Sequence, residues 1–166
     1  MEKIYELPIL ALRQKGWSVM LASQRRDLPG PLRQRYSWLA PEVLEFVVGL
    51  EEAVSPSRQA WLLGIGDFSG LNAAAFGWNA WEAMSLDAAG DDEEEIAMVT
   101  SFWDEHFPFL MSVKDGYAYF ALRRQGLQVV VGDEPEFEAS ARPVDYSLST
   151  FLERLSAPSH EFERWV

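Results

Sequence analysis

The chain of 166 residues contains no cysteine. This absence excludes a disulfide scaffold, a thiolate zinc site, an iron–sulfur cluster and a cysteine nucleophile. Histidine is scarce as well, because His106 and His160 are the only two. A serine–histidine–aspartate triad would need one of them as its base. We expect His106 to cap the last carbonyls of a helix and His160 to lie in the C-terminal tail, so neither favours catalysis.

Long apolar runs and an excess of basic residues are also missing. No apolar run approaches the ~20 residues of a membrane span, and the N-terminus lacks the basic start, apolar core and cleavage site of a secretory signal. The sequence therefore predicts a cytoplasmic protein with no membrane contact. Its 14 basic and 26 acidic residues give a net charge of −12. That balance argues against direct nucleic-acid binding, and no glycine-rich phosphate loop is present.

Acidic and basic residues are distributed unevenly along the chain. The first 36 residues carry seven basic and three acidic side chains, whereas the remaining 130 hold 23 acidic and seven basic ones. We expect the basic N-terminal segment, residues 1–29, to pack against the acidic body of its own chain, with a nucleic-acid-binding arm as the alternative. Residues 30–157 are expected to form one domain. Residues 158–166 are expected to be a loosely attached tail, although Phe162 and Trp165 could dock.

Hydrophobic periodicity predicts the elements of this domain. Helices are expected over about 8–15, 41–54, 92–106 and 148–155, with one or two helical turns over 78–86. Strands are expected over 60–65, 109–113, 117–123 and 127–131, the last two joined by a tight hairpin at Gln125–Gly126. The order predicts a single α+β domain with a mainly antiparallel sheet and helices before, between and after the strands.

Several residues have expected structural roles. Trp61, in a predicted strand, and Trp103, on a predicted helical stripe, should be buried with their indole N–H groups near acceptors. Gly116 and Gly132 should lie in turns, where glycine permits positive φ or close chain approach. Four further residues belong to the same framework: Pro108 at a helix end, Tyr117 at a strand start, and Phe151 and Leu152 in the core.

Two acidic segments have different predicted roles. The run Asp91–Glu95 could bind a cation, but we interpret it as the start of a helix, where carboxylates complement the helix dipole. The second set comprises Asp115, Asp133, Glu134, Glu136 and Glu138. Pro135 cannot donate to a ladder, so this stretch belongs at an edge or in a loop. We predict a solvent-exposed acidic rim that forms part of a partner surface, with protection of a sheet edge, or carboxylate catalysis or metal binding, as alternatives.

Six segments, in order, carry a family resemblance. They are YSWLAPEVLEF from Tyr36, AWLL from Ala60, FGWN from Phe76, FWDEHFPFLMSVKDGYAY from Phe102, VGDEPEFE from Val131 and SLSTFLERL from Ser147. Together, over about residues 30–156, the chain resembles the SUKH superfamily, the Smi/Knr-type proteins that include a yeast cell-wall-synthesis regulator and many bacterial immunity proteins. Ala40 departs from the leucine that this family commonly has before the proline, and the basic N-terminal segment does not map onto the family.

The resemblance implies a single α+β domain that binds other proteins, needs no cofactor or metal and has no known catalytic activity. Many bacterial members neutralise a toxin, often a nuclease. We therefore expect an immunity protein that binds a cognate, basic, nuclease-type toxin, whose positive surface the acidic body would attract. A regulatory scaffold without a toxin partner is the first alternative. A carboxylate-based or metal-dependent hydrolase is the second, and the oligomeric state stays open.

Overall fold

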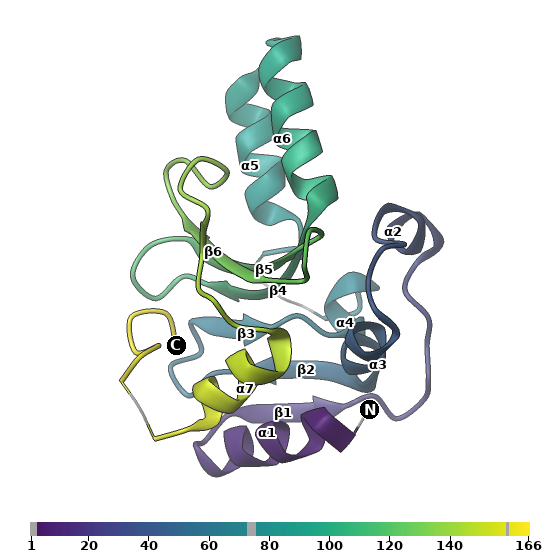
Figure 1. The fold of residues 1–166 in the computed structure, drawn as a ribbon, viewed down its shortest axis with the longest axis vertical. Coiled ribbons are helices and arrows are strands. Elements are labelled where there is room, and N and C mark those ends of the chain that lie inside the picture. The colour runs from purple at the N-terminus through teal and green to yellow at the C-terminus, as the bar shows by residue number, and fades with distance from the viewer. Residues whose placement is uncertain (1–2, 73–75, 159) are drawn as a thin grey trace.

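The computed structural model describes residues 3–72, 76–158 and 160–166. In these residues the strands form one seven-stranded sheet in which each strand pairs antiparallel with the next along the chain (Figure 1). The strands are β1 (Ser18–Leu21), β2 (Leu50–Val54), β3 (Ala60–Leu62), β4 (His106–Ser112), β5 (Ala118–Arg123), β6 (Val129–Asp133) and β7 (Arg142–Pro143). The α+β fold with a mainly antiparallel sheet is confirmed.

The helices lie around this sheet at different places. They are α1 (Lys3–Gln14), α2 (Gly30–Arg35), α3 (Pro41–Gly49), α4 (Ile65–Phe68), α5 (Ala80–Ala89), α6 (Glu93–Glu105) and α7 (Leu148–Ser156). Figure 1 shows α1 and α7 close together near β1 and β2. Helices α5 and α6 form an antiparallel pair that projects from the opposite end of the sheet (Figure 1).

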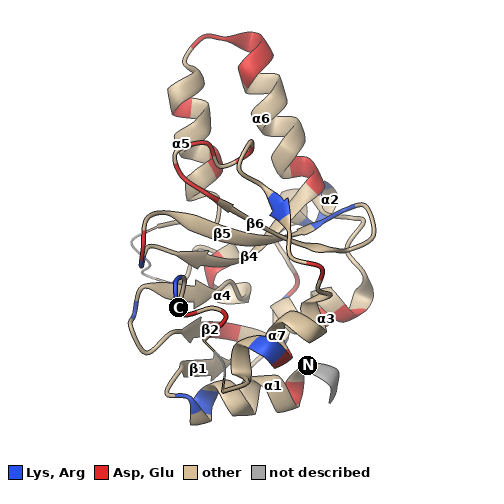
Figure 2. Cartoon of the chain, turned by 60° about the vertical axis from the view of Figure 1, so that its left-hand side comes forward, with Lys and Arg blue, Asp and Glu red and all other residues tan. Residues whose placement is uncertain are grey.

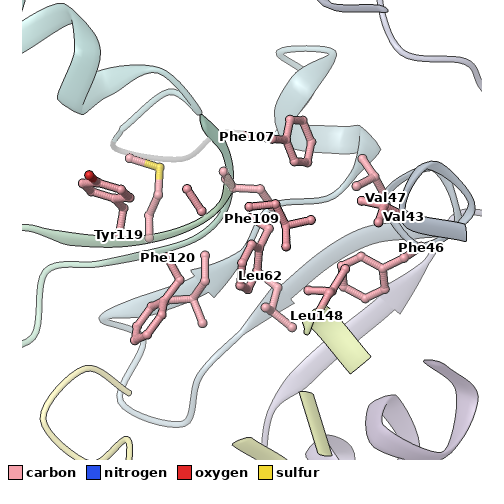
Figure 3. Close-up of a cluster of buried hydrophobic side chains, with 14 of the residues drawn as sticks. Val43, Phe46, Val47, Leu62, Phe107, Phe109, Tyr119, Phe120 and Leu148 are labelled. Carbon is pink, nitrogen blue, oxygen red and sulfur yellow. The ribbon is translucent and has the colours of Figure 1, made fainter. Parts of the chain in front are cut away.

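The core fills the space between the sheet and the helices that cover it. Leu62 of β3, Phe109 of β4 and Phe120 of β5 converge there with residues of α3 and α7 (Figure 3). Phe151 and Leu152 are fully buried, as expected, and the Phe151 ring lies 5.1 Å from that of Phe109. Burial of each such large side chain contributes about 1.5–3 kcal/mol to folding.

The helix expected over 41–54 is wrong in its second half. Helix α3 ends at Gly49, and Leu50–Val54 is strand β2. Periodicity alone misleads here, because Leu50 and Val54 continue the helical stripe that Val43 and Val47 begin. The chain instead forms ladders on both sides, since Val54 pairs with Ser18 of β1 and with Trp61 of β3. The strand expected over 60–65 is correspondingly shorter and is followed by α4.

The basic N-terminal segment is part of the domain. Strand β1 pairs with β2, and α1 packs beside α7. Arg25 and Arg26 form ion pairs with Glu45 and Glu51, respectively. Lys15 Nζ donates to backbone carbonyls at the end of α7, at 2.8–2.9 Å. The segment therefore supplies an edge strand and a packed helix to the same sheet and core as the residues that follow it.

The C-terminal tail is docked, contrary to the expected loose attachment. Phe162 is buried, with its ring 4.9 Å from that of Phe151 and 6.0 Å from that of Phe120. Ser112 Oγ donates to the carbonyl of Trp165 at 2.6 Å. Two aromatic side chains thus supply enough buried apolar surface to hold this short segment against the sheet.

Pro108 and Trp61 depart from their expected roles. Pro108 does not stop the helix: α6 ends at Glu105, and Pro108 lies inside β4 at a register shift, where a missing N–H is tolerated. Trp61 is half-buried and stacks on Phe76, with ring centroids 6.4 Å apart. Its indole N–H has no hydrogen-bond partner in the described part of the chain.

The two glycines meet different demands. Gly116 has a φ of +90°, which confirms the expected turn between β4 and β5. Gly132 lies within β6 rather than in a turn. A Cβ atom there would come within 2.4 Å of Tyr119 Oη, so glycine permits the close approach of the Tyr119 ring. That ring reaches across β6, and its hydroxyl donates to the Phe137 carbonyl at 2.8 Å.

None of the helices in the described residues is both long and apolar enough to cross a lipid bilayer.

Candidate partner-binding surface

The α5–α6 hairpin is built by local signals around residues 90–95. Gly90 follows α5 with a φ of +57°, a conformation that glycine adopts readily. Asp92 then caps α6, because its Oδ1 accepts from the backbone N–H groups of Glu94 and Glu95 at 3.0 and 3.1 Å. The interpretation of the acidic run as a helix start is confirmed. Trp78–Leu86, ambiguous in the sequence, lies largely in α5.

Two buried tryptophans anchor the foot of the hairpin, which is the end next to the sheet, formed by the start of α5 and the end of α6. Trp81 of α5 stacks on Tyr117 and Phe137, with ring centroids 4.7 and 5.5 Å apart, and its Nε1 donates to the Ala118 carbonyl at 3.1 Å. Trp103 of α6 is 3% exposed, as expected for its stripe, and its Nε1 donates to Glu138 Oε1 at 2.6 Å. Each helix is therefore held both by packing and by a directed hydrogen bond.

A cluster of three charged side chains supports the foot from the other side. Arg35 of α2 donates to both carboxylate oxygens of Glu82, at 2.6 and 2.9 Å, and to Asp104 at 2.7 Å. Burial by itself lowers the pKa of Arg35, but the hydrogen bonds and negative charges around it raise that pKa above its ordinary value. Arg35 thus stays charged and joins α2 to both helices of the hairpin.

The outer part of the hairpin carries an unbalanced negative charge. Residues 80–105 contain nine acidic residues and no lysine or arginine. Six of the nine are exposed and form no ion pair with another described residue. We call these six the acidic tip: Asp87, Asp91, Asp92, Glu93, Glu94 and Glu95. Figure 2 shows acidic residues at the end of the hairpin farthest from the sheet.

Two methionines expose apolar surface on the same hairpin. Met84 of α5 is 41% exposed, and Met98 of α6 is 61% exposed. Methionine side chains are flexible and polarizable, so they adapt to the surface of a partner. The hairpin therefore combines adaptable apolar contacts with a strong field of one sign. The sequence predicted no partner surface here, although the absence of lysine and arginine over 80–105 can be read from it directly.

Two carboxylates of the predicted acidic rim lie close to arginines of the same chain. Asp133 lies near two cations, with its Oδ2 at 3.4 Å from Arg142 Nη2 and 3.7 Å from Arg164 Nη2. Asp115 Oδ2 is 3.4 Å from Arg164 Nε. These two carboxylates are thus close to balancing charges on their own chain, which weakens the field that they present to a partner.

The three glutamates of this set point in different directions. In an extended segment, side chains two residues apart would point to the same side. The chain instead turns after β6, so the three glutamates do not share one side, and Pro135 lies in the loop as predicted. Glu134 accepts from the Tyr117 backbone N–H at 3.0 Å, and Glu136 is exposed. Glu138 is half-buried in the foot of the hairpin, where it accepts from Trp103 and, at 3.0 Å, from Ser85 Oγ. The prediction of a solvent-exposed acidic rim is wrong for Glu138.

Two further titratable groups, His106 and Asp67, have structural partners. His106 Nδ1 lies 2.7 Å from the Phe102 carbonyl at the end of α6, which confirms the capping role, and burial lowers its pKa. Asp67 accepts from Gly64 N at 2.8 Å and from Asn72 Nδ2 at 2.9 Å, and burial raises its pKa. Within the described ranges, no three histidine, aspartate or glutamate side chains gather closely enough to hold a metal ion.

Comparisons with protein-family models, curated proteins and solved structures gave no match.

Proposed function

We propose that this protein is a non-catalytic protein-binding module that acts inside the cell and contacts its partner with the acidic tip and the adjoining methionines. One observation carries the proposal: a hairpin anchored at its foot holds the six carboxylates of the acidic tip away from the body of the domain, with no lysine or arginine over residues 80–105. Charges held in this way attract a basic protein surface and raise its rate of association.

The chemistry of the tip favours a basic toxin, such as a nuclease, as the partner. A nuclease needs a positive surface to bind phosphates, and an acidic hairpin placed on that surface would compete with the nucleic acid. The SUKH-like segments support the same function, because many proteins of that superfamily neutralise toxins. A regulatory scaffold is the alternative, and the identity of the neighbouring gene separates the two.

A charge-matched comparison tests the surface. The tip variant carries Asp87→Asn, Asp91→Asn and Glu94→Gln, and leaves the Asp92 cap intact. The control variant carries Glu42→Gln, Glu136→Gln and Glu153→Gln, which are exposed positions outside the hairpin. Binding of each to the purified product of the neighbouring gene is measured at several salt concentrations. We expect the tip variant to associate about tenfold or more slowly with a flatter salt dependence, and the control to stay near wild type.

Cell growth supplies a second measurement. Co-expression of the wild-type chain should restore growth of cells that produce the neighbouring gene product, whereas the tip variant should restore it less. Both variants should unfold at nearly the wild-type temperature, because exposed charges contribute little to stability. Equal loss of binding in the tip and control variants would contradict the assignment to the hairpin. A neighbouring product that is neither basic nor bound would contradict the immunity role.

A further inference from the structure

Helix α1 carries two apolar stripes. Tyr5, Ile9 and Leu12 are buried against the core, as one stripe of an amphipathic helix should be. Leu7 and Leu10 lie on a second stripe and are 75% and 51% exposed. The fold of one chain does not account for this second stripe, because neither leucine is covered.

Strand β1, the next element along the chain, also exposes apolar side chains. It is an edge strand of the sheet, with Met20 and Leu21 exposed by 57% and 40%. The opposite edge, β7, has two residues, one of them a proline, and so offers little to pair with. Of the seven exposed large hydrophobic side chains in the described residues, four lie on α1 and β1. Exposed apolar residues are therefore concentrated at this end of the domain.

A hydrogen bond from Arg13 shows that the exposed stripe of α1 lies beside the edge of the sheet. Its Nη2 donates to the Val19 carbonyl of β1 at 3.0 Å. Leu7, Leu10 and Arg13 follow one another at a spacing of three residues, which keeps them on neighbouring positions of one helix face. We call this surface the α1–β1 face and define it by Glu6, Leu7, Leu10 and Arg13 of α1 and the adjoining edge of β1 at Val19.

The order of charges on the α1–β1 face is complementary to itself. Glu6 precedes Arg13 by seven residues, or two helical turns, so the two lie on the same side of α1 with the leucines between them. Both side chains are exposed, and neither forms an ion pair with another described residue. When two such helices pack antiparallel about a two-fold axis, each Glu6 meets the Arg13 of the other copy, and the leucines meet each other.

We propose that two copies of this chain associate through the α1–β1 face, with their α1 helices antiparallel. A second copy fits this face better than a partner of one charge sign, because the face presents an acid and a base at opposite ends of an apolar centre. The hairpin lies at the far end of the molecule (Figure 1), so both acidic tips stay accessible in the dimer. The inference is independent of the proposed function.

Sedimentation equilibrium of the full chain tests the dimer. We expect a dimer for the wild type and at least about tenfold weaker association for Leu10→Glu, because the substitution buries a carboxylate at the centre of the interface. Met98→Glu is the matched control, since Met98 is similarly exposed on the hairpin. It should leave the dimer intact, and circular dichroism should show both variants folded. A wild type that stays monomeric at every soluble concentration would overturn the proposal, and so would a dimer that Met98→Glu disrupts and Leu10→Glu does not.

A charge swap tests the antiparallel arrangement. Glu6→Arg alone and Arg13→Glu alone should each weaken the dimer about fivefold or more, because each places like charges opposite one another. A mixture of the two variants should form a mixed dimer as tight as wild type, since every facing pair in it has opposite signs. Failure of the mixture to recover, while both single variants are weakened and folded, would exclude this arrangement.

Discussion

The acidic tip and the loop between β6 and β7 contain the same residue types, yet their carboxylates have opposite roles. At the end of β6, where this loop begins, Asp133 lies near arginines, and within the loop Glu138 accepts from Trp103 and Ser85. In the tip, no carboxylate pairs with a cation among the described residues, and only Asp92 accepts hydrogen bonds, from its own helix. A carboxylate is available to a partner when the fold brings no donor to it.

The path of the chain explains this difference. The loop runs beside the foot of the hairpin and the turn between β4 and β5, where indole, hydroxyl and backbone N–H groups need acceptors. The tip lies beyond the sheet, where each helix has the other as its main neighbour (Figure 2). Substitutions in the loop and at the foot should therefore change stability, whereas those in the tip should change binding.

The largest effect is expected for Trp103→Ala. The change removes a buried indole and leaves Glu138 without its 2.6 Å donor. We expect the free energy of unfolding in denaturant to fall by about 3–5 kcal/mol. Met98→Ala, on the exposed side of the same helix, should change it by less than about 0.5 kcal/mol. Similar losses in both variants would mean that the hairpin foot is not specifically anchored.

Arg35→Ala should be almost as costly. It leaves Glu82, whose side chain is 9% exposed, without its bidentate partner. We expect a loss of about 3 kcal/mol in equilibrium unfolding. Arg33→Ala is the control, because its 3.4 Å pair with Asp27 is exposed and should contribute less than about 0.5 kcal/mol. Replacing Arg35 and Glu82 together by Met and Leu should recover most of the loss. If it does not, the burial of an unpaired Glu82 carboxylate is not the cause of the loss.

Glu138→Ala and Glu136→Ala should differ in their effect on stability, although both remove a glutamate from the same loop. Removal of its carboxylate orphans the Trp103 N–H and the Ser85 hydroxyl, which should cost about 1–3 kcal/mol. Glu136→Ala should be nearly neutral because Glu136 is exposed. Glu138→Gln should retain most of the stability, since its amide oxygen still accepts. Thermal and denaturant unfolding of the three variants would show whether this order holds.

Asp92→Ala should be the exception within the tip. The substitution removes the acceptor for two N–H groups at the start of α6 and should cost about 1 kcal/mol. Asp91→Ala, one residue earlier, should change stability little, since Asp91 is exposed and caps nothing. Denaturant unfolding followed by circular dichroism would measure both. Equal effects at the two positions would show that charge, and not capping, controls the start of α6.

The smallest effect concerns His106 and pH. Its pKa is lowered in the folded state, so the unfolded chain binds a proton more readily. Stability from this group should be complete above the ordinary value of about 6.5 and decrease as pH falls below it. His106→Gln should therefore lose less stability than wild type between about pH 7.5 and pH 5. A steeper loss in the variant would contradict the sign of the shift.

Prediction from sequence succeeded where one segment contains its whole signal. Helix α6 has its cap, acidic first turn and core stripe within one run of residues, and the β5–β6 hairpin has its turn between two apolar runs. It failed for β1, whose partner β2 lies far along the chain, and for β2, whose Leu50 and Val54 also fit a helical stripe. The run Asp91–Glu95 was correctly interpreted as a helix start, but the isolation of these carboxylates from cations depends on how far the hairpin projects.

The sequence by itself determined the α+β class, the amphipathic helices and the burial of Trp103, Phe151 and Leu152. Each of these follows from the hydrophobic pattern within a short segment of the chain. Only the tertiary structure decided which charges are engaged. Arg35 reaches Asp104 across 69 positions, and Glu138 reaches Trp103 across 35. Such contacts have no local pattern, since a hydrogen bond depends on the distance in space between two groups and not on their separation along the chain.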